Sequence, residues 1–282
     1  MSRVLDATLR ALYGRYVPEP VRNSLRLHLT LLQRDREPIR VEPPAARRIA
    51  VLAPHMDDEV FGPGGTLAAC AAAGASVTVV YLTDGSKGYA TSWNGRMPKE
   101  AEARLVATRK AEARAAGALL GFGEPVFLDL PDGALAVTAE AVRRLSDALG
   151  RLAAEAVFLP FFTDIHHDHW LTNALFVEAG RRLPAAVECW AYEVWTPLPA
   201  NAVVDISGAI DTKRRAMAVF VSQRVDYDYT GAVEALNRYR SLFTTKGTGF
   251  AEAFYVADLS FYRRLYRATA VGHRPISSEA LA

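Results

Sequence analysis

Residues 49–59 read Ile49-Ala50-Val51-Leu52-Ala53-Pro54-His55-Met56-Asp57-Asp58-Glu59. The apolar first half is typical of a strand buried in a sheet. A Gly-Pro-Gly-Gly turn at 62–65 and an alanine-rich, helix-like stretch follow the polar half. His55, Asp57 and Asp58 are therefore expected in the turn that leaves the C-terminal end of a strand, which is where open α/β sheets bind their ligands.

A second polar run has the same position relative to a strand. Residues 156–160 are another apolar stretch, and shortly afterwards the chain reads Asp164-Ile165-His166-His167-Asp168-His169. Two such strand ends can converge on one metal ion. Two histidines and one carboxylate with an open coordination position suit a catalytic zinc, and we assign His55, Asp58 and His169 as the ligands. Either run alone would be equally typical of polar loop residues, so each supports the other.

The rest of the chain alternates between strand-like and helix-like segments. Strands are expected at 48–53, 76–82, 126–129, 156–160, 188–194 and 203–206. Helices are expected at 64–74, 99–120, 138–153, 170–182, 211–221 and 231–243. Such alternation predicts an α/β fold with a mostly parallel sheet and helices on both faces. The turn at 62–65 lacks the spacing of a phosphate-binding loop, so we interpret it as a place of close backbone packing.

Composition narrows the class of protein. The chain has 282 residues, half of them hydrophobic, and a formal net charge of +2. We expect one domain over 46–282, preceded by an N-terminal extension over 1–45. The balanced charge does not provide the excess of basic residues that is typical of nucleic-acid binding. No apolar stretch reaches the roughly 18 residues of a membrane helix. A cytoplasmic protein that acts on a small molecule is therefore predicted, with Cys70 and Cys189 as buried thiols.

The N-terminal extension has an amphipathic pattern. Charged residues interrupt its apolar ones, which argues against a signal peptide, and spacings of three and four favour a helix. The apolar residues are Val4, Leu5, Leu9, Leu12, Tyr13 and Tyr16. We expect this stripe to pack against the rest of the chain or against a second subunit of a homo-oligomer, with docking on a membrane surface as the alternative.

The two polar runs resemble the motifs of a known enzyme family. Residues 54–59 are similar to the Pro/Ala-His-Pro-Asp-Asp-Glu signature of the PIG-L/LmbE-like zinc de-N-acetylases, and residues 166–169 to the family's His-Pro-Asp-His motif. Further matches extend the resemblance over about residues 47–256, at Thr83-Asp84-Gly85, Arg109, Glu112, 127–133, Lys213, Ser222-Gln223 and Ala251-Glu252-Ala253-Phe254. The resemblance implies a Rossmann-like three-layer α/β sandwich that hydrolyses N-acetyl groups of amino sugars and their conjugates.

Three positions depart from the family pattern. Met56 and His167 stand where the family has prolines. Both lie between proposed ligands, so the chemistry is expected to survive. Phe220 stands where many relatives carry a histidine, and we expect this change to affect a substrate contact and not hydrolysis.

Amide hydrolysis suggests roles for the other polar residues. Zinc lowers the pKa of a bound water from 15.7 to about 7, and a base must then take the second proton. Asp57 adjoins Asp58 but would point elsewhere, so we assign it as the general base, as the resemblance also implies; burial or a neighbouring charge must raise its pKa. His166 is expected to stabilise the oxyanion, and Asp168 to orient a histidine ligand.

Contacts to the substrate are assigned through the resemblance. Arg109 and Asp132 match family positions near the mouth of the pocket, and we expect both to hydrogen-bond sugar hydroxyls. The polar loop at 84–98 is expected to shape the pocket, and its Trp93 could stack on a sugar ring or anchor its own loop. His28 and His273 have no ligand partners nearby in the sequence, so we expect no role for them at the metal.

The sequence therefore predicts a zinc-dependent hydrolase that removes an N-acetyl group from an amino sugar or a glycosylated metabolite. One alternative is a metal-dependent amidase that acts on a non-sugar amide. The other is a sugar- or nucleotide-binding Rossmann-like module without activity, which would have no need of the base Asp57. One divalent ion is expected, and His/carboxylate sites accept ions other than zinc.

Overall fold

The computed structural model describes residues 16–18, 21, 22, 25, 37–87, 97–223 and 228–269. Most of the predicted extension, Trp93 with most of its loop, His28 and His273 lie outside these residues. Within them, eight strands form one sheet in the order β1-β7-β8-β6-β5-β2-β3-β4. The strands are β1 (Ile39–Arg40), β2 (Arg48–Ala53), β3 (Ser76–Thr83), β4 (Val126–Leu130), β5 (Ala156–Pro160), β6 (Glu188–Tyr192), β7 (Ala202–Asp205) and β8 (Ala251–Asp258).

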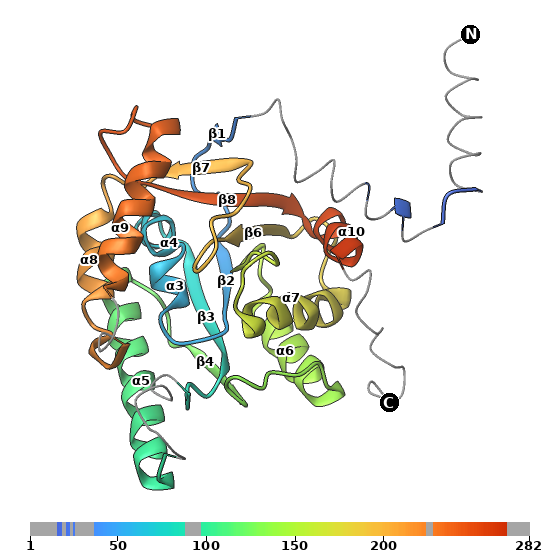
Figure 1. Cartoon of the computed structure of the whole chain (residues 1–282), viewed down its shortest axis with the longest axis vertical. Coiled ribbons are helices and arrows are strands. Elements are labelled where there is room, and N and C mark those ends of the chain that lie inside the picture. The colour runs from blue at the N-terminus through green and yellow to red at the C-terminus, as the bar shows by residue number, and fades with distance from the viewer. Residues whose placement is uncertain are drawn as a thin grey trace.

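Helices cover both faces of this sheet (Figure 1). The α-helices are α3 (Asp58–Phe61), α4 (Gly64–Ala72), α5 (Lys99–Leu120), α6 (Ala139–Leu152), α7 (His167–Ala179), α8 (Ile210–Met217), α9 (Tyr229–Arg240) and α10 (Leu259–Thr269). Three short 3-10 helices, η1 (Gly180–Arg182), η2 (Val221–Gln223) and η3 (Ser241–Phe243), complete the described elements.

The sheet has an apolar core on each face because successive strand residues point to opposite sides. In β2, Ala50 and Leu52 belong to the core beneath α6, α7 and α10. Ile49, Val51 and Ala53 belong to the core beneath α4, α5 and α8. A strand buried on both faces must be apolar throughout, which explains the unbroken run in the sequence. The predicted α/β sandwich with a mostly parallel sheet is confirmed.

The central strand β2 lies where the direction of winding changes. It pairs in parallel with β3 on one side and with β5 on the other. The chain moves outward from β2 to β3 and β4, and then returns to β5 on the opposite side. The carboxyl ends of β2 and β5 therefore border the crevice at which doubly wound sheets bind ligands.

Two elements near the end of the chain were not expected as secondary structure, β8 and the helix α10 that follows it. β8 runs antiparallel between β6 and β7. Its apolar pattern is interrupted by Glu252, which is only 2% exposed. A buried carboxylate needs partners from elsewhere in the fold, so the local sequence does not show that this stretch is a central strand.

Several element boundaries differ from the predicted ones by two residues or more. α7 begins at His167 and not at residue 170, because His166 caps it by accepting a hydrogen bond at Nδ1 from Asp168 N (3.3 Å). α8 ends at Met217, before the predicted end at residue 221. Residues 39 and 40 of the predicted extension pair in parallel with β7, so this end of the extension is part of the sheet.

Three further expectations concern single features. Cys70 and Cys189 are free and buried, as predicted. The turn at 62–65 packs closely, also as predicted: a Cβ added at Gly65 would lie 2.9 Å from Ile206 side-chain atoms. In the described part of the chain, no helix is long and apolar enough to cross a membrane.

Candidate metal centre

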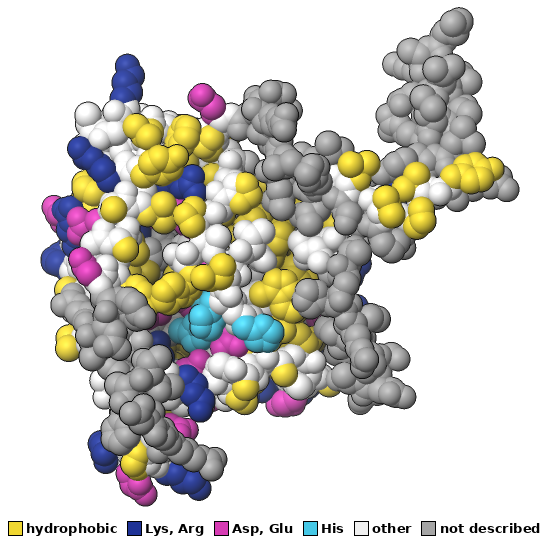
Figure 2. Space-filling view, in the orientation of Figure 1, with side chains coloured by type: hydrophobic (Ala, Val, Ile, Leu, Met, Phe, Trp, Pro, Cys, Tyr) yellow, Lys and Arg dark blue, Asp and Glu magenta, His cyan; other side chains and the backbone are white. Residues whose placement is uncertain are grey.

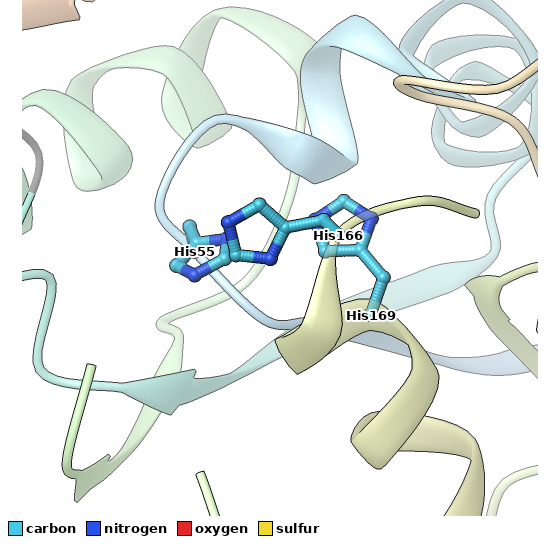
Figure 3. Close-up of side chains that lie close together, drawn as sticks. All are labelled: His55, His166 and His169. Atoms are coloured by element: carbon cyan, nitrogen blue, oxygen red, sulfur yellow. The ribbon is translucent and has the colours of Figure 1, made fainter. Parts of the chain in front are cut away.

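The two polar runs meet at the edge formed by the ends of β2 and β5. His55 follows β2, and His166 and His169 stand at the start of α7, which follows β5. Figure 3 shows the three imidazoles side by side. The ring centroid of His166 lies 4.7 Å from that of His55 and 4.9 Å from that of His169. Parallel pairing of the strands thus joins residues more than a hundred positions apart.

The carboxylate of Asp58 lies between two of these imidazoles. Its Oδ2 is 3.3 Å from His55 Nδ1, and its Oδ1 is 3.3 Å from His169 Nε2. Oδ2 also accepts a hydrogen bond from the backbone N–H of His55 (2.8 Å). Burial opposes the charge on Asp58, but His169 and His55 outweigh it and hold the pKa of this carboxyl well below its usual value.

The donor set fits a tetrahedral metal ion. The ring nitrogens of His169 face carboxylates, but neither makes a well-aligned hydrogen bond among the described residues, although the side chain is fully buried. Ligand atoms held about 2.0–2.1 Å from one zinc ion lie roughly 3.3–3.4 Å from one another in a tetrahedron. Asp58 meets that spacing through a different oxygen on each side, with Oδ2 3.3 Å from His55 Nδ1 and Oδ1 3.3 Å from His169 Nε2. Donor atoms of His55, His166 and His169 also lie within 4.8 Å of one another.

Carboxylates stand behind both of the imidazoles that face Asp58. His55 Nε2 lies 3.2 Å from Asp132 Oδ1 and 3.3 Å from Asp168 Oδ2. His169 Nδ1 lies 3.5 Å from Asp164 Oδ2. Such partners fix the orientation and the tautomer of a ligating histidine. Asp168, expected to orient a histidine, lies against His55 of the other polar run.

Asp164 was given no role from the sequence. Its Oδ1 accepts a hydrogen bond from His166 N (2.9 Å), and its Oδ2 accepts one from Trp195 N (3.0 Å) while facing His169. One carboxylate therefore ties the start of α7 to the segment after β6. The only signal in the sequence is its position two residues before His166, which is typical of an aspartate that closes a turn on its own backbone.

Burial and the nearby carboxylates shift the pKa values of His55 and His169. Burial opposes the charge on His55, but hydrogen bonds to Asp132, Asp168 and Asp58 raise its pKa well above the usual value. Burial likewise opposes the charge on His169, and the carboxylates of Asp58 and Asp164 raise its pKa to about 9. The two imidazoles thus lie in a strongly negative environment, which favours a cation.

Asp57 turns away from the two imidazoles that hold Asp58. Its Oδ2 lies 3.7 Å from an Arg109 guanidinium nitrogen, and its side chain is 18% exposed. Burial and the charge of Asp58 raise the pKa of Asp57 to about 7, against the opposing charge of Arg109. A carboxyl with a pKa near neutrality can both accept and return a proton at physiological pH.

His166 is partly exposed, and its ring meets that of His55 edge-on at an interplanar angle of 74°. Burial and the neighbouring histidines lower its pKa. Because its Nδ1 accepts from Asp168 N, the proton of the neutral ring is on Nε2. Figure 2 shows histidine side chains at the molecular surface, between hydrophobic and acidic side chains.

Arg109 and Asp132 lie inside the protein and not at its surface. They are 3% and 5% exposed. Arg109 donates hydrogen bonds to the carbonyls of Gly85 (3.1 Å) and Met56 (3.4 Å), and it lies 3.8 Å from Asp132. Asp132 accepts a hydrogen bond from Lys87 N (2.8 Å) in addition to facing His55. Their predicted role as substrate contacts stays a prediction.

Residues 50–180, which contain both polar runs, match the family model PIG-L, described as GlcNAc-PI de-N-acetylase. This part of the chain belongs to the PIG-L family. The family predicted from the two motifs is thus confirmed. The PIG-L match begins in β2 and ends after α7, so it includes every residue assigned to the metal and to the base.

A curated relative shares the same region. A 1D-myo-inositol 2-acetamido-2-deoxy-alpha-D-glucopyranoside deacetylase from Rhodococcus erythropolis is 40% identical over 86 residues. The similar stretch is 30% of this chain and 29% of that relative. The match therefore spans less than a third of the relative's length.

Solved structures share the fold over most of the chain. An N,N'-diacetylchitobiose deacetylase from Pyrococcus horikoshii has a TM-score of 0.66 and 21% identity, covering 91% of this chain and 94% of that one. GalB, a 4-carboxy-2-hydroxymuconate hydratase from Pseudomonas putida KT2440, has a TM-score of 0.64 and 24% identity, covering 74% of this chain and 96% of that one. At these identities the likeness shows the fold alone.

A buried ion pair outside the PIG-L match fixes the turn behind Asp58. Lys213 of α8 is fully buried, and its Nζ contacts Glu252 Oε1 (2.6 Å) and the carbonyl of Gly62 (2.9 Å). Glu252 also accepts hydrogen bonds from the backbone N–H groups of Gly65 and Thr66 (both 2.8 Å). The pair therefore joins β8 and α8 to both ends of the turn between α3 and α4.

Replacing Lys213 should cost much of the stability of the fold. We expect Lys213→Met to lower the free energy of unfolding by about 3–5 kcal/mol, because it leaves a buried carboxylate without its cation. Arg214→Met is the matched control, since Arg214 pairs with Glu234 at the surface and exposed pairs contribute little. Urea denaturation measures both, and equal losses in the two variants would contradict the role of Lys213.

Proposed function

We propose that this chain is a zinc-dependent hydrolase that removes the N-acetyl group from an amino sugar or an amino-sugar conjugate. The observation that carries the proposal is the convergence of His55, Asp58 and His169, with the differently directed Asp57 beside them. Membership of residues 50–180 in the PIG-L family supports deacetylation. The similarity to a deacetylase of an inositol-linked amino sugar supports a sugar conjugate as the substrate.

The proposed ligand atoms are His55 Nδ1, an oxygen of Asp58 and His169 Nε2. When bound, zinc would lower the pKa of a water molecule to about 7 and polarise the amide carbonyl. The carboxylates behind His55 and His169 would hold the opposite ring nitrogens, so that the nitrogens facing Asp58 present lone pairs. The 3.3 Å contact between His169 Nε2 and Asp58, and the lack of a well-aligned hydrogen bond at this buried nitrogen, support this assignment.

Asp57 and His166 would carry out the proton chemistry. The carboxylate of Asp57 accepts a proton from the attacking water while the new C–O bond forms. His166 Nε2 donates a hydrogen bond to the carbonyl oxygen as that oxygen gains negative charge. The proton held by Asp57 then passes to the amide nitrogen as the C–N bond breaks, which releases the free amine and acetate.

Arg109 and Asp132 are proposed to contact the hydroxyl groups of the sugar. Both also have partners inside the protein, since Arg109 faces Asp57 and Asp132 faces His55. A substitution that removed only a substrate contact would raise KM with little effect on kcat. The ratio of the two effects therefore separates substrate binding from support of the site.

The first test is the reaction itself, because the hydratase GalB shows that this fold is not confined to deacetylases. We expect the zinc-loaded full chain to release acetate and free amine in equal amounts from N-acetylglucosaminyl-inositol or from N,N'-diacetylchitobiose. A chelator should stop the release, and added zinc should restore it. Failure of the zinc-loaded protein to release acetate from either probe would contradict the proposal.

The second test concerns the ligands. His55→Ala, Asp58→Ala and His169→Ala should each lose both bound metal and activity, because three protein ligands hold a catalytic zinc. His167→Ala is the control, since that ring stacks near Trp170 (6.5 Å) and has no assigned metal role. Metal analysis of the purified variants measures occupancy, and full occupancy in His169→Ala would remove that residue from the ligand set.

The third test separates the base from the ligand. Asp57→Ala should retain the metal and lose about 10²–10⁴-fold in kcat, which is the usual contribution of general-base catalysis. Asp58→Ala should lose the metal. The reverse pattern, in which Asp57→Ala loses metal and Asp58→Ala keeps it, would show that the roles of the two carboxylates are exchanged.

A further inference from the structure

The backbone of Asp57 has a conformation that residues with side chains rarely adopt, with φ 148° and ψ −28°. The other described non-glycine residues with positive φ have values between 44° and 54°, in the ordinary left-handed region. A conformation such as that of Asp57 persists only where the surrounding structure holds it, and such residues cluster at active sites. Contacts around the backbone of Asp57 must therefore hold this conformation.

Both sides of the peptide bond that leads into Asp57 are held by buried side chains. The N–H of Asp57 donates to Glu59 Oε2 (3.2 Å), and the carbonyl of Met56 accepts from Arg109 (3.4 Å). The hydroxyl of Tyr81 donates to the other oxygen, Glu59 Oε1 (2.7 Å). Glu59 is fully buried and Tyr81 is 1% exposed, so the hydrogen bond between these two side chains is shielded from bulk water.

This arrangement explains how two successive carboxylates take different directions. Asp58 begins α3 and reaches between His55 and His169, whereas Asp57 lies beside Arg109. The carbonyl of Asp57 already accepts from the N–H groups of Val60 and Phe61 (both 2.9 Å). Because that carbonyl is bound to the first turn of α3, the orientation of the preceding peptide decides in which direction the Asp57 carboxylate points.

We propose that Glu59 and Tyr81 form a positioning pair, which holds the Met56–Asp57 peptide opposite Arg109 and thereby aims the carboxylate of Asp57. The inference rests on the proposed role of Asp57 as the general base. Glu59 is not a metal ligand in this arrangement, because its two oxygens face Asp57 N and the Tyr81 hydroxyl. A base displaced by about 1 Å can lose roughly 100-fold in rate.

Three substitutions test the pair through kinetics. Glu59→Ala should lower kcat by about 10–100-fold, and Tyr81→Phe by less, because the Glu59 carboxylate remains. Glu59→Gln should recover most of the rate, since its amide oxygen can still accept from Asp57 N. KM and zinc content should not change in any of them.

A matched control separates positioning from a general loss of stability. Tyr192 is as buried as Tyr81, and its hydroxyl donates to the β2 carbonyl of Leu52 (2.9 Å). Tyr192→Phe should therefore lower the melting temperature about as much as Tyr81→Phe while leaving kcat at the wild-type value. A drop in kcat equal to that of Tyr81→Phe would overturn the proposal.

A double substitution shows whether Glu59 acts through Asp57. Adding Glu59→Ala to Asp57→Ala should not lower the residual rate further, because the group being aimed is already absent. A further loss of 10-fold or more, or a loss of zinc in Glu59→Ala, would show that Glu59 acts on another part of the site.

Hydrogen exchange gives a readout that does not need activity. The Asp57 amide should exchange slowly in the wild-type chain, more than 10-fold faster in Glu59→Ala, and at the wild-type rate in Tyr192→Phe. Unchanged exchange of the Asp57 amide in Glu59→Ala would overturn the proposed positioning pair, even if the enzyme is active. Faster exchange in Glu59→Ala, together with no acetate release by the wild-type chain, would support the positioning pair and contradict the proposed function.

Discussion

Parallel pairing between β2 and β5 is the constraint on which the site depends. The register pairs Ala50 with Val157 and Val51 with Phe158, so the two strands end at the same edge. His55 and Asp58 leave one strand there, and His169 enters from the helix that follows the other. A shift of either strand by one residue would exchange its two buried faces. The two apolar cores that oppose such a shift therefore also keep the donor atoms in place.

Charge at this edge is distributed in layers. Asp58 lies between two imidazoles, and Asp132, Asp164 and Asp168 lie behind them. The pKa of His55 and that of His169 are both raised by these carboxylates. Under the proposed function, a divalent ion would supply the positive charge that such a site favours, and its binding would displace protons from the imidazoles. Arg109 is the cation on the opposite side, close to Asp57 and Asp132.

In the C-terminal part of the chain, the described elements α8 and β8 support the site through contacts to the turn between α3 and α4. β8 inserts antiparallel between β6 and β7 and carries Glu252 to the N-terminus of α4. Lys213 completes that contact and holds the carbonyl of Gly62. These residues lie beyond the PIG-L match at 50–180, yet they restrain the turn between α3 and α4, directly after the short helix that starts with Asp58. The match thus contains the proposed metal ligands and the proposed base, and the elements after it stabilise the neighbouring turn between α3 and α4.

Local sequence determined which segments are strands and where the reactive side chains leave them. An apolar run followed directly by His55-Met56-Asp57-Asp58 can be interpreted without a partner, because burial on two faces requires apolar residues throughout. The same holds for 156–160 and the run that opens at Asp164. Together with the resemblance to the two motifs, these patterns were enough for the parallel α/β fold, the PIG-L family and the grouping of His55, Asp58 and His169 at one edge.

Only the tertiary structure decided which atoms face one another. Residue type does not reveal that Asp164 stands behind His169, that Asp132 is buried against His55, or that Glu59 holds the amide of Asp57. Nor does it show that Glu252 lies in a central strand, since its partner Lys213 is supplied by another helix. Periodicity is a local property of the chain, whereas a buried polar group is satisfied through space by residues far away in the sequence.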